Sequence, residues 1–75
     1  MLKIDKWKLS QNIEAAIRDL DMTYDEICLK ANMYPKNISK WVNCAAVPSA
    51  INLIKLSRVT GVSMDKLLEG VAVDE

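Results

Sequence analysis

The chain has 75 residues, of which 51% are hydrophobic, and its ten basic side chains balance its ten acidic ones, so it has room for one domain with one small core. It has no histidine, two cysteines, and no apolar run long enough to span a membrane or to form a signal peptide. This composition argues against a zinc site, a disulfide framework, histidine-based catalysis and membrane insertion.

We therefore expect a single soluble, cytoplasmic domain over residues 1-75 that is not an enzyme and that holds no metal or cofactor. Cys28 and Cys44 are expected to be reduced, since two cysteines without a secretory signal are more often small buried residues than a disulfide.

The first predicted element is a helix over residues 6–20. Asp5 is a suitable N-cap, and apolar residues then recur at steps of three and four, which predicts one buried stripe. The stripe consists of Leu9, Ile13, Ala16, Ile17 and Leu20.

A second, shorter helix is predicted over residues 24–31. Thr23 followed by Glu26 has the form of a capping box, in which each residue serves a backbone amide of the other. Asn32 then suits the left-handed conformation that ends a helix and turns the chain.

The third predicted helix covers residues 35–42. Pro35 fits the first helical position, where its missing N–H costs nothing. Ile38, Trp41 and Val42 are expected to face inward, and the polar residues between them are expected to face outward. These polar residues are Lys36, Asn37, Lys40 and Asn43.

Two further helices complete a predicted all-α fold. One begins at the pair Pro48-Ser49 and ends at Gly61, and a last short helix is capped by Ser63 and ends at Gly70. The fourth helix is expected to bury five apolar residues, namely Ile51, Leu53, Ile54, Leu56 and Val59. No strand pattern of any length occurs, although the tail over residues 71–73 could extend against a partner.

The charges are distributed unevenly along this neutral chain. Residues 30–58 carry five basic side chains and no acidic one, residues 1–29 sum to −2, and residues 59–75 sum to −3. Attraction to a polyanion depends on local potential rather than on total charge, so a nucleic acid is the first partner to consider. The alternative is a solvated face that lacks acids by chance.

Helices two and three, joined by a tight turn at Asn32, predict a helix-turn-helix over about residues 24–43. Counted from Tyr24, the fifth and ninth residues are Cys28 and Asn32, and the fifteenth and eighteenth are Ile38 and Trp41. This spacing supplies a small residue at the helix crossing, a left-handed turn residue and two apolar anchors.

With this spacing, the chain resembles the Cro and phage-repressor family of helix-turn-helix regulators, also called the XRE family, over about residues 9–70. The resemblance rests on five segments in order: 22–27, 37–41, 47–49, 53–57 and 61–70. The family often has glycine at the positions of Asn32 and Cys44, and longer polar side chains at those of Tyr24 and Pro35.

The resemblance implies a five-helix, lambda-repressor-like domain whose third helix enters the major groove of DNA. Lys36 and Asn37 are then the expected base contacts, and Lys40 is expected to reach a base or a phosphate. Tyr34, Asn43 and Ser49 are candidate phosphate contacts. Lys36 in the first turn of the third helix, with no acid beside it, would leave the positive end of the helix open to a phosphate.

The function predicted in this way is sequence-specific binding of double-stranded DNA by a small phage, prophage or bacterial transcriptional repressor. It is expected to bind as a homodimer, with helix five and the 71–73 tail as the interface. The alternative is a helix-turn-helix module that binds a repressor or polymerase instead of DNA, which zero net charge and the absence of arginine from helix three favour.

Overall fold

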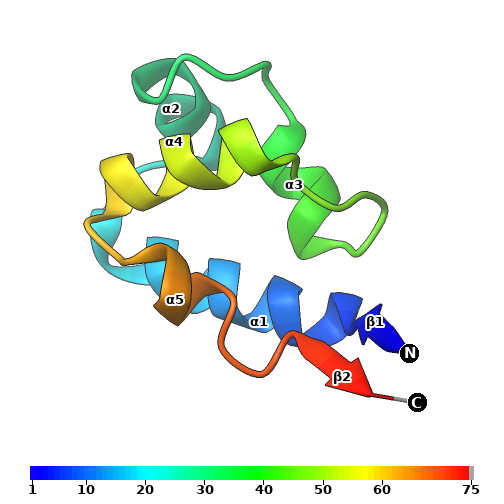
Figure 1. The fold of residues 1–75 in the computed structure, drawn as a ribbon. Coiled ribbons are helices and arrows are strands. Elements are labelled where there is room, and N and C mark those ends of the chain that lie inside the picture. The colour runs from blue at the N-terminus through cyan, green and yellow to red at the C-terminus, as the bar shows by residue number, and fades with distance from the viewer. Residues whose placement is uncertain (75) are drawn as a thin grey trace.

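The computed structural model describes residues 1–74 and consists mainly of helices (Figure 1). In chain order its elements are β1 (Leu2–Ile4), α1 (Lys6–Ile17), the 3₁₀ turn η1 (Arg18–Leu20), α2 (Tyr24–Lys30), α3 (Asn37–Val42), α4 (Ala50–Thr60), α5 (Met64–Leu67) and β2 (Ala72–Asp74). The five predicted helices are confirmed, and the expectation of a purely helical fold is wrong because two short strands are present.

Three helices begin at the predicted caps Asp5, Thr23 and Ser63, and α4 begins directly after the predicted Pro48-Ser49 start. The side chain of Asp5 accepts a hydrogen bond from the Lys8 amide at 3.1 Å, and Ser49 and Ser63 cap α4 and α5 in the same way. At the start of α2, Thr23 and Glu26 form the complete capping box, with both bonds at 3.1 Å. These bonds hold the pKa of Glu26 below its ordinary value, because the Thr23 amide and hydroxyl stabilise the carboxylate.

Helix α3 begins two residues later than the sequence predicts. Lys36 has φ of +74° and ψ of −4°, so it is a left-handed N-cap rather than a residue of the first helical turn, and Pro35 precedes the helix. The Asn37 amide instead donates to the carbonyl of Tyr34 at 3.4 Å, which closes a separate turn before the helix starts. The expectation that Lys36 occupies the first turn is therefore wrong.

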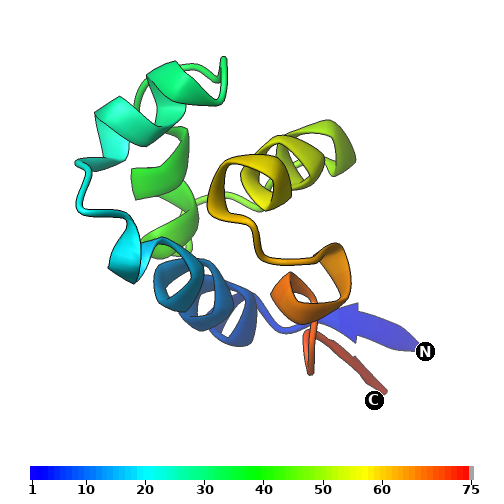
Figure 2. The ribbon, with the colours of Figure 1, turned by 90° about the vertical axis from the view of Figure 1, so that its left-hand side faces the viewer.

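The helices surround one core. In Figure 2, α2 and α3 lie on the left, α4 and α5 lie on the right, and α1 lies below α2 and α3 at about the level of α5. The buried apolar side chains of this core are Leu9, Ile13, Ile17, Ile27, Cys28, Met33, Ile38, Trp41, Leu56, Leu67 and Val71. The only buried polar side chain among the described residues is Ser10, whose hydroxyl donates to the carbonyl of Val42 at 2.6 Å and so joins α1 to the end of α3.

Two isoleucines of α4 are not buried as predicted. Ile51 is 59% exposed and Ile54 is 40% exposed, whereas Leu53 and Leu56 face inward. A helix of 3.6 residues per turn packed on one side has room for a single inward stripe, and here Leu53 and Leu56 occupy it. The two isoleucines consequently lie on an adjoining, open face.

The tail pairs with the N-terminus of its own chain rather than with a partner. β1 and β2 are antiparallel, with Leu2 opposite Asp74 and Ile4 opposite Ala72. The Asp5 amide extends the pairing by donating to the carbonyl of Val71 at 2.8 Å. The two ends of the chain are therefore held together next to α1 and α5 (Figure 1).

Within the part of the chain that the structure describes, no helix has the length and apolar character needed to cross a membrane. Both cysteines are free thiols, Cys28 in the core and Cys44 half-buried after α3.

Candidate nucleic-acid interface

The outer face of α3 carries three exposed polar side chains. Ile38 and Trp41 anchor the helix in the core, at 0% and 4% exposure, which turns the opposite side of this short helix to solvent. Lys36, Lys40 and Asn43 are exposed there, as the sequence predicts. Lys40 lies on the helix itself, and Lys36 and Asn43 flank it as its N-cap and C-cap.

Asn37 lies at the edge of this face and is half-buried. Its side-chain amide makes no hydrogen bond within residues 1–74, so both its donor and its acceptor are available to a ligand. A side-chain amide offers a donor and an acceptor together, which is the pairing that the edge of adenine requires.

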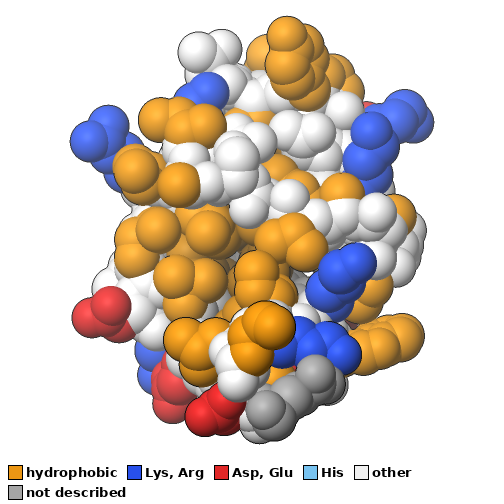
Figure 3. Space-filling view, turned by 45° about the vertical axis from the view of Figure 1, so that its right-hand side comes forward, with side chains coloured by type: hydrophobic (Ala, Val, Ile, Leu, Met, Phe, Trp, Pro, Cys, Tyr) orange, Lys and Arg blue, Asp and Glu red, His pale blue; other side chains and the backbone are white. Residues whose placement is uncertain are grey.

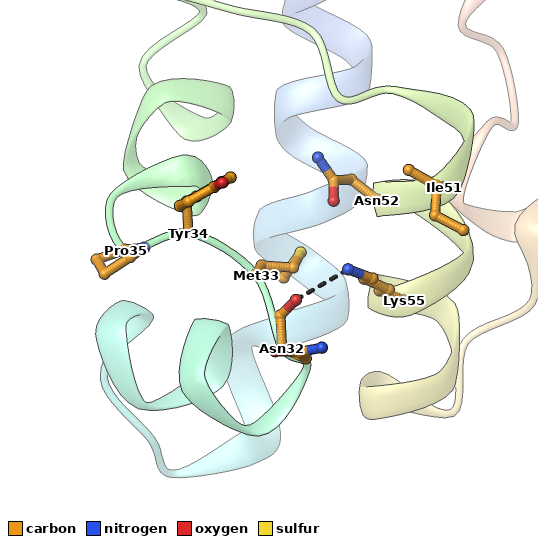
Figure 4. A pocket seen from close by; sticks show the side chains of 7 residues that line it. All are labelled: Asn32, Met33, Tyr34, Pro35, Ile51, Asn52 and Lys55. Carbon is orange, nitrogen blue, oxygen red and sulfur yellow. Dashed lines mark hydrogen bonds between the residues drawn. The ribbon is translucent and has the colours of Figure 1, made fainter.

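A groove adjoins α3 between the α2–α3 connection and the first turns of α4 (Figure 4). Its volume is about 540 Å³, and seven residues line it: Asn32, Met33, Tyr34, Pro35, Ile51, Asn52 and Lys55. Figure 4 shows Tyr34 on the connection and Asn52 on α4 at opposite sides of the groove, with Met33 between them. The groove therefore combines a hydroxyl, two amides and an ammonium group.

Lys55 is held in a fixed position in this groove. Its ammonium donates to the carbonyl oxygen of Asn32 at 2.9 Å, which ties α4 to the turn that follows α2. Asn32 itself is left-handed, with φ of +58°, as predicted. A lysine fixed in this way keeps a positive charge at the groove with less loss of side-chain entropy on binding than a free lysine incurs.

The structure distributes the six predicted site residues over adjoining surfaces. Tyr34, which is 82% exposed, lines the groove, and Lys36, Lys40 and Asn43 are exposed along α3 with Asn37 at their edge. Ser49 is exposed at the start of α4, where its hydroxyl accepts from the Asn52 amide at 3.4 Å. The prediction missed Asn52 and did not assign Lys55 or Asn32 to a site. Of these three, only Lys55 had a functional signal in the sequence, because it is one of the five basic residues of the acid-free segment 30–58.

Among the described residues, none that lines the groove and none in α3 or α4 carries a carboxylate. α3 and α4 contain neither Asp nor Glu, and the nearest acids in the sequence, Glu26 and Asp65, stand in the first turns of α2 and α5. The surface consequently presents cations and neutral hydrogen-bond donors without competing negative charge. It can hold phosphate oxygens and can pair with polar edges of a base. Among the described residues, no group of three or more metal-ligating side chains is present.

Comparison of the chain with protein-family models, with curated proteins and with solved structures gave no match.

Proposed function

We propose that this protein is a sequence-specific DNA-binding regulator of transcription, of the type found in small phage, prophage or bacterial repressors, with α2 and α3 as its helix-turn-helix. Two backbone features support this fold assignment. Asn32 and Cys44 both have left-handed conformations, with φ of +58° and +60°. They stand at positions where the resembled family often has glycine, the residue that adopts this conformation without strain.

The observation that carries the proposal is the acid-free outer face of α3 next to the groove. Lys36 and Lys40 are exposed without an ion-pair partner among residues 1–74. Lysines that only solubilise a helix commonly have acidic neighbours on the same helix, and α3 has none. An uncompensated positive surface on a neutral body is the electrostatic pattern of a phosphate-binding face.

In this mechanism α3 enters the major groove with the exposed face toward the base pairs. Lys36 donates to guanine acceptors and Asn37 pairs with adenine, while Lys40 contacts a base or a phosphate. Tyr34, Asn43 and Ser49 fix the register by contacts to the phosphate backbone. The groove beside α3, with Asn52 and Lys55, adds two donors to this set.

The test is selection of bound sequences from random duplexes with the wild-type protein and with Asn37→Ala. The variant is expected to lose the preference at one position, and Asn43→Ala is the matched control, because an amide that contacts only phosphate carries no base preference. Unchanged preference in Asn37→Ala would overturn the base contact. Absence of duplex binding at low salt by the wild-type protein would overturn the function.

A homodimer is part of the proposal, since two recognition helices about 34 Å apart can enter successive major grooves. The surface offered for it is an apolar face beside α4 (Figure 3). Three exposed large side chains gather around a hollow in this apolar face, namely Ile4, Val47 and Leu68. Four of the residues that line its hollow of about 210 Å³ are Ile4, Val47, Pro48 and Leu68.

The exposed apolar area around this hollow suits a weak dimer that forms on DNA. A fully exposed large aliphatic side chain offers about 120 Å², so Ile4, Val47 and Leu68 together expose on the order of 150 Å². A standard interface buries about 800 Å² per partner, somewhat more than half of it apolar. The hollow therefore provides the apolar centre of an interface and not its whole area.

Sedimentation with and without a duplex tests the dimer. Ile4→Lys combined with Leu68→Lys is expected to leave a monomer on DNA, while Leu29→Lys, at a position on α2 that is 82% exposed, serves as the control. A wild-type protein that remains monomeric on its selected site would refute the dimer.

The apolar face also favours the second candidate function, a protein-interaction module with the same fold. A large exposed apolar area commonly marks a protein-binding surface. The two functions differ in salt dependence, because duplex affinity through several phosphates falls steeply with salt, whereas a protein-binding module has little duplex affinity at any salt concentration.

A further inference from the structure

A second cavity lies beyond Lys55, where the last turns of α2 and α4 come together. Its volume is about 420 Å³, and Lys30, Ala31, Lys55, Arg58 and Val59 line it. This volume falls in the range of about 300–1,000 Å³ that is usual for sites that hold small ligands. The lining contains three cations, two aliphatic side chains and no acid, so its chemistry suits an anion.

The three cations have no counter-ion within residues 1–74. Lys30 and Arg58 make no ion pair or hydrogen bond through their side chains within residues 1–74, and Lys55 donates to the backbone carbonyl of Asn32. α4 contains no acid, and the two acids of α2 stand at its opposite end. Cations that line one cavity without a counter-ion raise its positive potential, which a bound anion would neutralise.

We propose that this cavity binds a phosphate group, and that the phosphate is a phosphodiester of the duplex held by α3. Arg58 offers a planar, bidentate donor that matches two phosphate oxygens, and Lys30 adds a mobile point charge from the other side. Lys55 lines both this cavity and the groove beside α3, so the two surfaces are continuous. The statement that the phosphate belongs to a duplex rests on the function proposed above, whereas the statement that the cavity binds a phosphate does not.

A competing explanation assigns these cations to the helix ends. Lys30 and Arg58 both stand in last turns, where the negative end of the helix dipole favours a positive charge. That role predicts that removal of the charge lowers stability and leaves anion binding unchanged. The proposed role predicts unchanged stability and weaker anion binding, because both side chains are exposed and make no ion pair or hydrogen bond within residues 1–74.

The first measurement is the salt dependence of duplex binding by fluorescence anisotropy. The double variant Arg58→Gln/Lys30→Gln is expected to reduce the slope of log affinity against log salt by about 0.9, the value for one phosphate, which corresponds to about an eightfold loss of affinity at 0.1 M salt, and each single variant is expected to show part of this change. Arg58→Lys keeps the charge and is expected to keep the slope. Lys66→Gln on α5, which lines a separate hollow, is the control for an equal change of net charge and is expected to leave the slope unchanged.

The second measurement adds inorganic phosphate to the protein and follows backbone amide resonances. Shifts centred on Ala31, Arg58 and Val59 that are absent in Arg58→Gln support the cavity as a phosphate site. If such shifts occur in a protein that binds no duplex, the phosphate site stands and its source is a free phosphate ligand, while the proposed regulator function fails. Unmoved resonances together with wild-type salt slopes in Arg58→Gln and Lys30→Gln would overturn the cavity and leave the regulator function intact.

Discussion

The left-handed conformation of Lys36 can be tested by comparing the stabilities of Lys36→Gly and Lys36→Ala. In an ordinary helix the alanine variant is the more stable, and here the glycine variant should be. A left-handed conformation costs a residue with a Cβ atom about 1–2 kcal/mol, and glycine avoids this cost but loses about 0.5–1 kcal/mol in chain entropy. Because Lys36 has φ of +74° and its side chain makes no capping bond, Lys36→Gly should be more stable than Lys36→Ala by about 0.5–1 kcal/mol. In the first turn of an ordinary helix the order is opposite.

Urea denaturation of the two variants measures this difference directly. Lys36→Ala keeps the Cβ atom and should stay within about 0.5 kcal/mol of wild type, because the lysine side chain is exposed. A gain of about 1 kcal/mol in Lys36→Gly corresponds to a melting temperature raised by about 4–8 °C. Both variants lack the ammonium group, so both should lose duplex affinity equally. A glycine variant less stable than the alanine variant would indicate that Lys36 lies within a helix that starts at Pro35, and would refute its left-handed conformation.

Three further variants probe the packing, the capping box and the link between α1 and α3. Leu56→Ala should cost about 2–5 kcal/mol because Leu56 is fully buried, whereas Ile51→Ala should cost less than about 0.5 kcal/mol; similar losses in thermal melts would contradict the open position of Ile51. Thr23→Ala should cost about 1 kcal/mol at neutral pH. Because the pKa of Glu26 is lowered in the folded state, the carboxylate contributes its full stabilisation above the ordinary glutamate pKa of about 4.3 and loses it as the pH falls through the folded-state pKa. The free energy of unfolding should therefore depend less on pH in Thr23→Ala than in the wild type. Identical pH profiles would show that Thr23 does not lower the pKa of Glu26. Ser10→Ala should cost about 1–3 kcal/mol in urea, since it leaves the carbonyl at the end of α3 unpaired; no change would show that this bond is dispensable.

The helices were predictable because their determinants are local. Four helices start at residues whose side chains accept a hydrogen bond from a backbone amide three residues later, and the structure contains all four of these caps: Asp5, Thr23, Ser49 and Ser63. The buried stripe of α1 follows from its periodicity. The left-handed Asn32 follows from the properties of its own side chain.

The features that were not predictable depend on contacts between distant segments. The pairing of residues 2–4 with 72–74 joins the two ends of the chain, and three-residue strands are too short to have a recognisable alternation. The start of α3 depends on the conformation of Lys36, which no property of lysine favours. The groove at the candidate site gathers Asn32, Asn52 and Lys55 from two segments, so its composition appears only when α4 packs beside the turn.

The backbone around α3 suggests why this element differs from the other helices. Among the described residues, four that are not glycine have positive φ, and three of them flank α3: Asn32, Lys36 and Cys44. Local strain of this kind persists where the surrounding structure imposes it, and it is concentrated at functional sites. A helix of six residues is too short to be stable alone, so Ile38, Trp41 and the bond from Ser10 must hold it. Under the proposed function, Ser10→Ala should therefore weaken duplex binding although Ser10 is buried and contacts no DNA, because it loosens the helix that presents Lys36 and Lys40.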